Sequence, residues 1–80
     1  MPENLPRVVG TVEWWSDEEG WGCVGADEAP GGAFVHFSMI EGDGFKTLRP
    51  GERVGFDLEH YPHGQDGYYY RAYRVQPLDR

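Results

Sequence analysis

The sequence predicts an all-β protein, a small antiparallel barrel of five strands with one short helical turn. Twelve glycines and six prolines are spread along 80 residues, which favours short strands and tight turns. The segment 54–59 alternates apolar and polar residues as a half-buried strand does. Five such segments are joined by turn sequences, and closing them into a barrel removes the exposed edges of a small sheet.

The five strands are expected at residues 8–15, 21–24, 33–37, 54–59 and 68–75. Segment 16–20 is rich in turn residues and segment 25–32 contains Pro-Gly-Gly, so both are interpreted as loops. Gly22 lies inside the second strand, where it permits close approach of another backbone or a ligand. Phe34 and His36, two apart, should share one face of the third strand.

Ser38 is placed to cap a single helical turn at 38–40, followed by a long irregular loop at 41–50. A further turn is expected at 62–67, before a run of three tyrosines that alternation divides between two faces. The core is assigned to Val12, Val24, Val35, Ile40, Val54, Phe56 and Val75. The expected organisation is a flexible leader at 1–7, one domain at 8–77 and a tail at 78–80.

Composition limits the cellular setting. No run approaches 18 apolar residues, so no membrane span is expected, and the first seven residues do not form a signal peptide. The lone cysteine, Cys23, allows no internal disulfide and fits a reducing compartment. A cytoplasmic location is the natural expectation.

Aromatic residues are concentrated between Trp14 and Phe37. A chain this small buries only about 60–70% of its unfolded surface, so some of these rings should face water. Exposed flat rings on a sheet suit stacking on unpaired bases. Burial in the core is the alternative for Trp14 and Trp21, and Trp15 is expected to be partly buried outside the main site.

Four segments, in this order, carry a resemblance to a known family: Gly10–Ser16 (GTVEWWS), Glu19–Val24 (EGWGCV), Phe34–Ser38 (FVHFS) and Gly44–Leu48 (GFKTL). They resemble the bacterial cold shock domain family over nearly the whole chain. The resemblance implies an OB-fold barrel whose second and third strands carry two RNA-binding motifs. The aromatic side chains of those motifs stack on single-stranded bases.

Site residues follow from the resemblance, position by position. The implied stacking residues are Trp14, Trp21, Phe34, His36, Phe37 and Phe45. Lys46 is the implied flanking contact to a phosphate or base. Apart from the resemblance, Arg71 and Arg74 near the C-terminal end are candidates for charge at the rim.

The chain departs from the family where charge and ring area matter. The family usually has lysine at the position of Glu13 and commonly at Glu19, and an aromatic residue at Cys23. These acidic replacements and the net charge of −7 should both lower affinity for a phosphate backbone, because that affinity comes largely from cationic side chains. Tryptophan replaces the usual phenylalanine at Trp15 and Trp21, which keeps or enlarges ring area. We therefore expect weaker binding with a large share from stacking.

Other kinds of site are not favoured by the sequence. His60 and His63 are interpreted as loop histidines, so no metal site is expected, and Cys23 as an inert small side chain. The acids of the 16–20 turn are expected to point into solvent. No nucleophile–base pair, phosphate loop or ATP motif stands out, so neither an enzyme nor a cofactor is expected.

The predicted function is binding of single-stranded RNA or DNA with little sequence preference, as an RNA chaperone or expression regulator. The alternative is an acidic protein-interaction module on the same barrel, with nucleic-acid binding weakened or lost. A monomer is expected, and exchange of strands through hinges at 25–32 or 41–44 is the route to a dimer.

Overall fold

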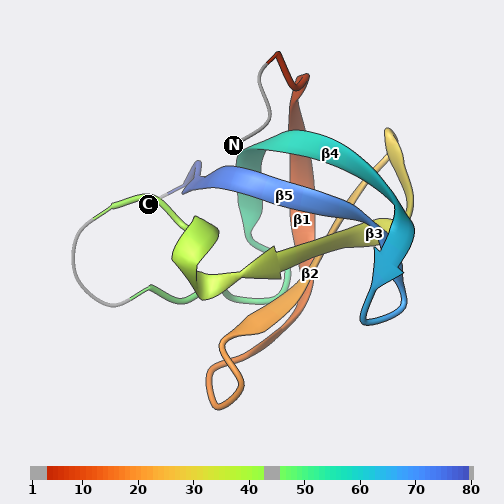
Figure 1. The fold of residues 1–80 in the computed structure, drawn as a ribbon. Helices are drawn as coiled ribbons and strands as arrows, with labels where there is room; N and C mark the ends of the chain where they lie inside the picture. The colour runs from red at the N-terminus through yellow and green to blue at the C-terminus, as the bar shows by residue number, and fades with distance from the viewer. Residues whose placement is uncertain (1–3, 43–45, 80) are drawn as a thin grey trace.

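The computed structural model describes residues 4–42 and 46–79, and it is a five-stranded barrel (Figure 1). The elements are β1 (Arg7–Ser16), β2 (Trp21–Ala26), β3 (Ala29–His36), the 3-10 helix η1 (Phe37–Met39), β4 (Arg53–Gln65) and β5 (Tyr68–Pro77). The all-β class and the five strands are confirmed. Within the described residues no helix is long and apolar enough to cross a membrane.

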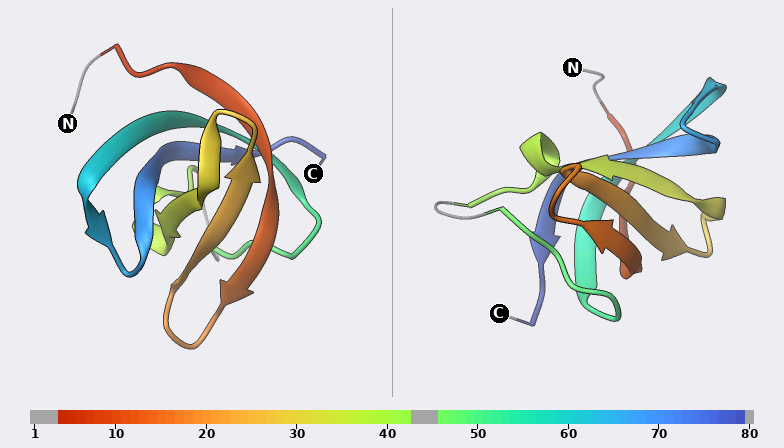
Figure 2. Two further views of the ribbon diagram at one scale, coloured as in Figure 1. Left: turned by 90° about the vertical axis from the view of Figure 1, so that its right-hand side faces the viewer. Right: turned by 90° about the horizontal axis from the view of Figure 1, so that it is seen from below.

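The strands close in the order β1-β2-β3-β5-β4 and curve around one interior (Figure 2). Four of the five contacts between neighbouring strands are antiparallel. The fifth, between β3 and β5, is parallel and pairs Phe34 with Arg71. The barrel is therefore mixed, and the expectation of a purely antiparallel sheet needs this one correction at the closing seam.

Two of the loops are shorter than the sequence indicated, those between β2 and β3 and between β4 and β5. Only residues 27 and 28 separate β2 from β3, because Gly31 and Gly32 adopt positive φ angles of 87° and 91° and let β3 continue through the Pro-Gly-Gly segment. β4 runs on to Gln65, so the expected turn at 62–67 contracts to Asp66-Gly67. Both of these turn residues have positive φ, the requirement of a two-residue type I′ hairpin.

The helical turn begins one residue earlier than expected. It covers Phe37–Met39, and the side chain of His36 accepts a hydrogen bond from the backbone N–H of Ser38. His36 therefore takes the capping role that was expected of Ser38. This ties the end of β3 to the segment that follows it.

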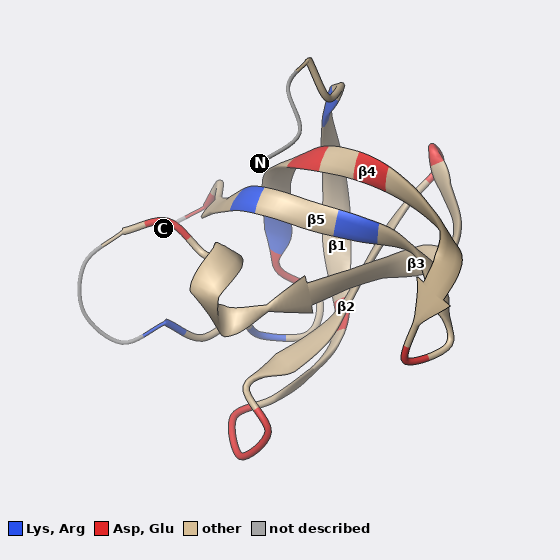
Figure 3. Ribbon diagram, viewed as in Figure 1, with Lys and Arg blue, Asp and Glu red and all other residues tan. Residues whose placement is uncertain are grey.

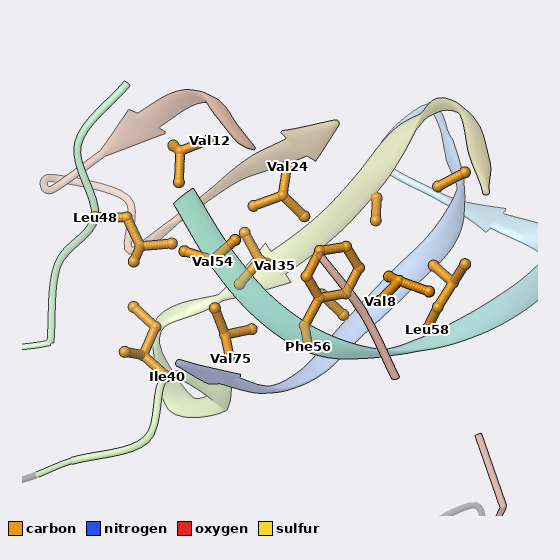
Figure 4. Packing of buried hydrophobic residues seen from close by; sticks show 13 residues of the cluster. Val8, Val12, Val24, Val35, Ile40, Leu48, Val54, Phe56, Leu58 and Val75 are labelled. Atoms are coloured by element: carbon orange, nitrogen blue, oxygen red, sulfur yellow. The ribbon is translucent and has the colours of Figure 1, made fainter. Parts of the chain in front are cut away.

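All seven residues assigned to the core are buried (Figure 4), none of them more than 3% exposed. The structure adds Val8, Ala29, Ala33, Leu48, Leu58 and Ala72 to the same cluster. Val54, Phe56 and Leu58 are buried on alternate positions of β4, as the 54–59 pattern predicted. The interior holds mostly aliphatic side chains, and the three tryptophans are half-buried around it, with Trp15 packed against the cluster.

The ends of the described chain are attached to the barrel. Arg7 is already part of β1, which differs from the flexible leader expected at 1–7, and its guanidinium donates to Asp57, Gln76 and the carbonyl of Arg74. At the other end the backbone N–H of Leu78 donates to the carbonyl of Arg53 over 3.0 Å.

Candidate nucleic-acid interface

A bulge in β1 turns Trp14 to the outside of the barrel. Val12 pairs with Val24, but Trp14 pairs with Cys23, so the register shifts by one residue at Glu13. Residues two apart in a regular strand share a face, and the extra residue breaks that rule here. Val12 therefore points into the core while Trp14 lies on the outer face.

Strand register then aligns the other site residues with Trp14. Cys23 pairs with Trp14 on one side and with Phe34 on the other, and Trp21 pairs with His36. Gly22 permits the close approach that the sequence predicted, since a Cβ there would lie 2.3 Å from the carbonyl oxygen of Trp14. The outer face of β1, β2 and β3 thus gathers residues that are up to 22 positions apart in the sequence.

Trp14, Trp21 and Phe34 form one aromatic cluster, called here the ring platform. The rings of Trp21 and Phe34 are stacked, with centroids 5.1 Å apart and planes 29° apart. Trp14 meets Trp21 edge-on, with centroids 4.7 Å apart. Both tryptophans are half-buried, whereas Phe34 is only 8% exposed. Trp14 and Trp21 therefore present the accessible ring surface, and Phe34 supports Trp21 from beneath.

His36 and Phe37 lie where β3 ends, with ring centroids 4.5 Å apart. Phe37 is 46% exposed, and its backbone N–H donates to the carbonyl of Gly20 over 2.8 Å. Gly20 has a φ of 78°, and a Cβ on it would lie 2.9 Å from the Phe37 ring. A glycine at this position therefore lets the β1–β2 turn pack against Phe37.

Two tryptophans use carboxylates of the β1–β2 turn as hydrogen-bond acceptors. Trp21 Nε1 donates to Glu19 over 3.2 Å, and Trp15 Nε1 donates to Asp17 over 2.9 Å. The Asp17 and Glu19 side chains are exposed as expected, but both also fix an indole. Trp15 is half-buried against the core, as predicted, and stays outside the ring platform.

Lys46 borders an open hollow of about 490 Å³ between the β1–β2 turn and the loop before β4. The lining includes Trp15, Phe37 and the acidic turn. Lys46 Nζ donates to the carbonyl oxygen of Ile40 over 2.8 Å, so one of its three protons is already engaged. Phe45, the remaining predicted stacking residue, lies outside the described residues.

The two candidate rim arginines have different surroundings. Arg71 Nε bonds Glu59 over 2.7 Å, and its guanidinium lies 3.9 Å from the centre of the Tyr61 ring. It also lines a hollow of about 220 Å³ together with Phe34 and His36. Arg74 bonds Asp57 over 2.6 Å, and it does not line this hollow. The structure therefore brings Arg71, and not Arg74, to the ring platform.

Carboxylates neutralise most of the arginine charge. Of the five described arginines, four form ion pairs: Arg7, Arg53, Arg71 and Arg74. Figure 3 shows the result on β4 and β5, where acidic and basic positions lie side by side, while the β1–β2 turn is purely acidic. Since phosphate attraction depends on available cations, this surface offers little of it.

Cys23 lies beneath the outer face and is 1% exposed. Burial raises the pKa of its thiol to about 11, and Glu13, whose Oε1 lies 3.4 Å from the sulfur, acts in the same direction. A thiol with so high a pKa carries almost no thiolate at neutral pH, which fits the inert role expected for it. Among the described residues no group of three or more His, Cys, Asp and Glu side chains is placed to hold a metal.

The structure also adds a ring, Tyr68, that the sequence separated from Tyr69 by alternation but did not distinguish from Tyr70. Tyr68, the first residue of β5, accepts a hydrogen bond from Trp14 Nε1 over 3.0 Å. Its ring centroid lies 6.3 Å from that of Trp21. Three consecutive tyrosines gave no reason to choose Tyr68, because its placement depends on how the β4–β5 hairpin folds back.

Comparison with known proteins gives a consistent result. Residues 8–77 match the family model described as the 'Cold-shock' DNA-binding domain. The major cold shock protein of Micrococcus luteus is 43% identical over 57 residues, 71% of this chain and 85% of that protein. The major cold shock protein CspA of Bacillus cereus is 48% identical over 54 residues, 65% of this chain and 76% of that protein.

A solved structure, titled drosophila Unr CSD456, shares the fold. It superposes with a TM-score of 0.66 at 20% identity, over 92% of this chain but only 27% of that one. With the match over residues 8–77 and these relatives, the chain belongs to the 'Cold-shock' DNA-binding domain family.

Proposed function

We propose that this protein binds single-stranded RNA or DNA by stacking unpaired bases on the ring platform. The observation that carries the proposal is the arrangement of Trp14 and Trp21 on the outer face, supported by the buried ring of Phe34. Stacking a base on such a ring contributes about 1–3 kcal/mol and tolerates any base. His36 and Phe37 extend the surface at the end of β3, and Phe45 remains a predicted contributor.

The binding is passive and depends little on charge. Four arginines are held by carboxylates, and Glu13 and Glu19 border the platform, so phosphate contacts contribute less than in a basic protein. Rings that capture unpaired bases oppose the re-formation of base-paired structure. This is the action of an RNA chaperone or an expression regulator, carried out by a cytoplasmic monomer.

An acidic protein-interaction module is the less favoured function. The outer face keeps its aromatic cluster, and the family model matches along 70 residues, 8–77, so the chain retains what base stacking requires. Competition distinguishes the two functions, because only a nucleic-acid site is blocked by oligothymidine. Light scattering at high protein concentration tests the monomer, and a mass of two chains would contradict it.

Tryptophan fluorescence titration with a short oligothymidine tests the proposed function. Bases stacked on Trp14 and Trp21 should quench emission to saturation, with only a shallow decrease in affinity between low and moderate salt. The same strand annealed to its complement is the control and should quench far less, because its bases are paired. Absence of quenching at tens of micromolar strand would refute the proposal.

A further inference from the structure

The β4–β5 hairpin folds back onto the ring platform and brings Tyr68 to it. Tyr68 and Trp14 are 54 residues apart in the sequence, yet the indole N–H of Trp14 donates to the Tyr68 hydroxyl over 3.0 Å. The Tyr68 ring stands edge-on to Trp21, with planes 78° apart. The hairpin projects from one end of the barrel in Figure 1. Tyr68 is the first residue of β5, directly after the Asp66-Gly67 turn, so its contacts with Trp14 and Trp21 join the tip of the hairpin to the platform.

Small residues beneath Tyr68 make room for its ring. Cys23 lies between Trp14 and Phe34 in the strand register, and its thiol contacts the Tyr68 hydroxyl. A Cβ added to Gly32 would lie 2.5 Å from the Cys23 sulfur and 3.5 Å from Tyr68 Cε1. A large side chain at either position would occupy the space of the Tyr68 ring. Its placement therefore follows from Cys23 and Gly32 as much as from the hairpin.

The Tyr68 ring has the properties that stacking needs. It is half-buried, so part of its surface remains open to solvent, and its hydroxyl is fixed by Trp14. Burial raises the pKa of the phenol, so Tyr68 is neutral at physiological pH and does not repel a phosphate.

Charge favours this side of the platform over the opposite one. Segment 60–71 contains one carboxylate, Asp66 at the tip, whereas the β1–β2 turn carries three in succession at 17–19. On the hairpin side, Gln65 and Arg71 line the hollow of about 220 Å³ that also borders Phe34. Glu59 on this side is paired with Arg71, and Glu13 lies beside Cys23 and acts on Tyr68. A strand crossing toward the hairpin therefore meets two carboxylates outside the described ion pairs, Glu13 and Asp66, against three in the acidic turn.

We propose that Tyr68 is a further base-stacking ring, which β5 adds to the platform beside Trp14 and Trp21. This inference rests on the proposed function. It adds a stacking residue from a strand that carries neither of the two RNA-binding motifs.

Affinity for a fluorescently labelled oligothymidine, measured by anisotropy, tests the role of Tyr68. Tyr68→Leu keeps apolar bulk but removes the ring, and it should weaken binding by about 5- to 150-fold. Tyr68→Phe keeps the ring and should bind within about threefold of the original protein. Tyr69→Ala is the matched control: Tyr69 is 58% exposed on the opposite face of the same hairpin, and its loss should leave affinity unchanged.

The outcomes separate this inference from the proposed function. If Tyr68→Leu melts as a folded protein and binds like the original, Tyr68 is not a stacking ring, and the proposed function stands. Equal losses in Tyr68→Leu and Tyr68→Phe would also overturn the inference, because the hydroxyl rather than the ring would then matter. If the unsubstituted protein does not bind oligothymidine, the proposed function fails and this inference fails with it.

A second variant covers the case in which Tyr68→Leu is destabilised. Adding Cys23→Phe to Tyr68→Leu places a ring from β2 in the space above Cys23, and it should recover most of the lost affinity. A folded double variant that binds no better than Tyr68→Leu would contradict the proposed stacking role.

Discussion

Replacing Trp21 with alanine removes the central ring of the platform. Trp21 is the ring that contacts both Phe34, stacked at 5.1 Å, and Trp14, edge-on at 4.7 Å. One stacked base is worth about 1–3 kcal/mol, which corresponds to about 5- to 150-fold in affinity. We expect the lower part of that range, about 5- to 30-fold, because the substitution uncovers Phe34 and so offers a base part of another ring face.

The same substitution lowers stability. Each aromatic pair contributes about 0.5–1.5 kcal/mol beyond area burial, so loss of the three pairs with Trp14, Phe34 and Tyr68 costs about 1.5–4.5 kcal/mol. In a domain of this size, each kcal/mol lowers the melting temperature by about 4–8 °C. Binding must therefore be measured well below the melting temperature of Trp21→Ala, so that weaker binding is not confused with unfolding.

Anisotropy of a labelled oligothymidine is the suitable assay, since it does not depend on tryptophan emission. Trp21→Phe is the matched control: it keeps a ring but loses the hydrogen bond to Glu19, and it should bind within about threefold of the original protein. A folded Trp21→Ala protein with unchanged affinity would refute the reasoning, because the most central ring of the platform would then bind no base.

Three further predictions concern charge and burial. Glu13→Lys should raise affinity for oligothymidine. It should also steepen the slope of log affinity against log salt by about 0.7, the value for one added phosphate contact on a single strand. An unchanged slope would show that no phosphate passes this position. Arg74 and Arg7 hold the pKa of Asp57 below its ordinary value of 3.8, so the pair stabilises the fold above that pH and the contribution is lost as pH falls through the lowered pKa. Asp57→Asn should therefore destabilise the protein more at neutral pH than in acid below pH 3.8, in melts at both pH values, whereas a deficit of equal size at both would contradict the pairing. Asp79→Asn, which breaks an exposed pair, should have little effect at either pH. Cys23 should react slowly with iodoacetamide at pH 8 and rapidly after denaturation, because its thiol is buried and has a pKa of about 11. Mass spectrometry measures the rate of alkylation, and rapid reaction in the folded protein would contradict that burial.

The barrel and its core could be predicted because they depend on local pattern. Alternation along β4 identified Val54 and Phe56 as core residues, and both are fully buried. The extent of β3 and β4 could not be predicted in the same way. Gly31 and Gly32 have positive φ, which a strand tolerates at a glycine. Whether the strand continues through them depends on pairing with β2, which the sequence does not specify.

The site was predicted less completely than the core. The resemblance named the residues of the ring platform, but the burial of Phe34 beneath Trp21 depends on ring packing across two strands. The ion pairs that occupy Arg71 and Arg74 join residues 12 and 17 positions apart, through strand register that no sequence pattern specified. Tyr68 reaches Trp14 across 54 positions, and such a contact is visible only in the folded chain.

The most direct measurement is a two-dimensional ¹H–¹⁵N NMR titration with a short oligothymidine. We predict that the indole N–H signals of Trp14 and Trp21 shift, together with the backbone amides of β2 and β3. The amides where β1 pairs with β4, from Arg7 to Gly10, should remain in place, because they lie in a strand pair apart from the ring platform. Absence of shifts at Trp14 and Trp21, or shifts confined to the acidic β1–β2 turn, would contradict base stacking on the ring platform.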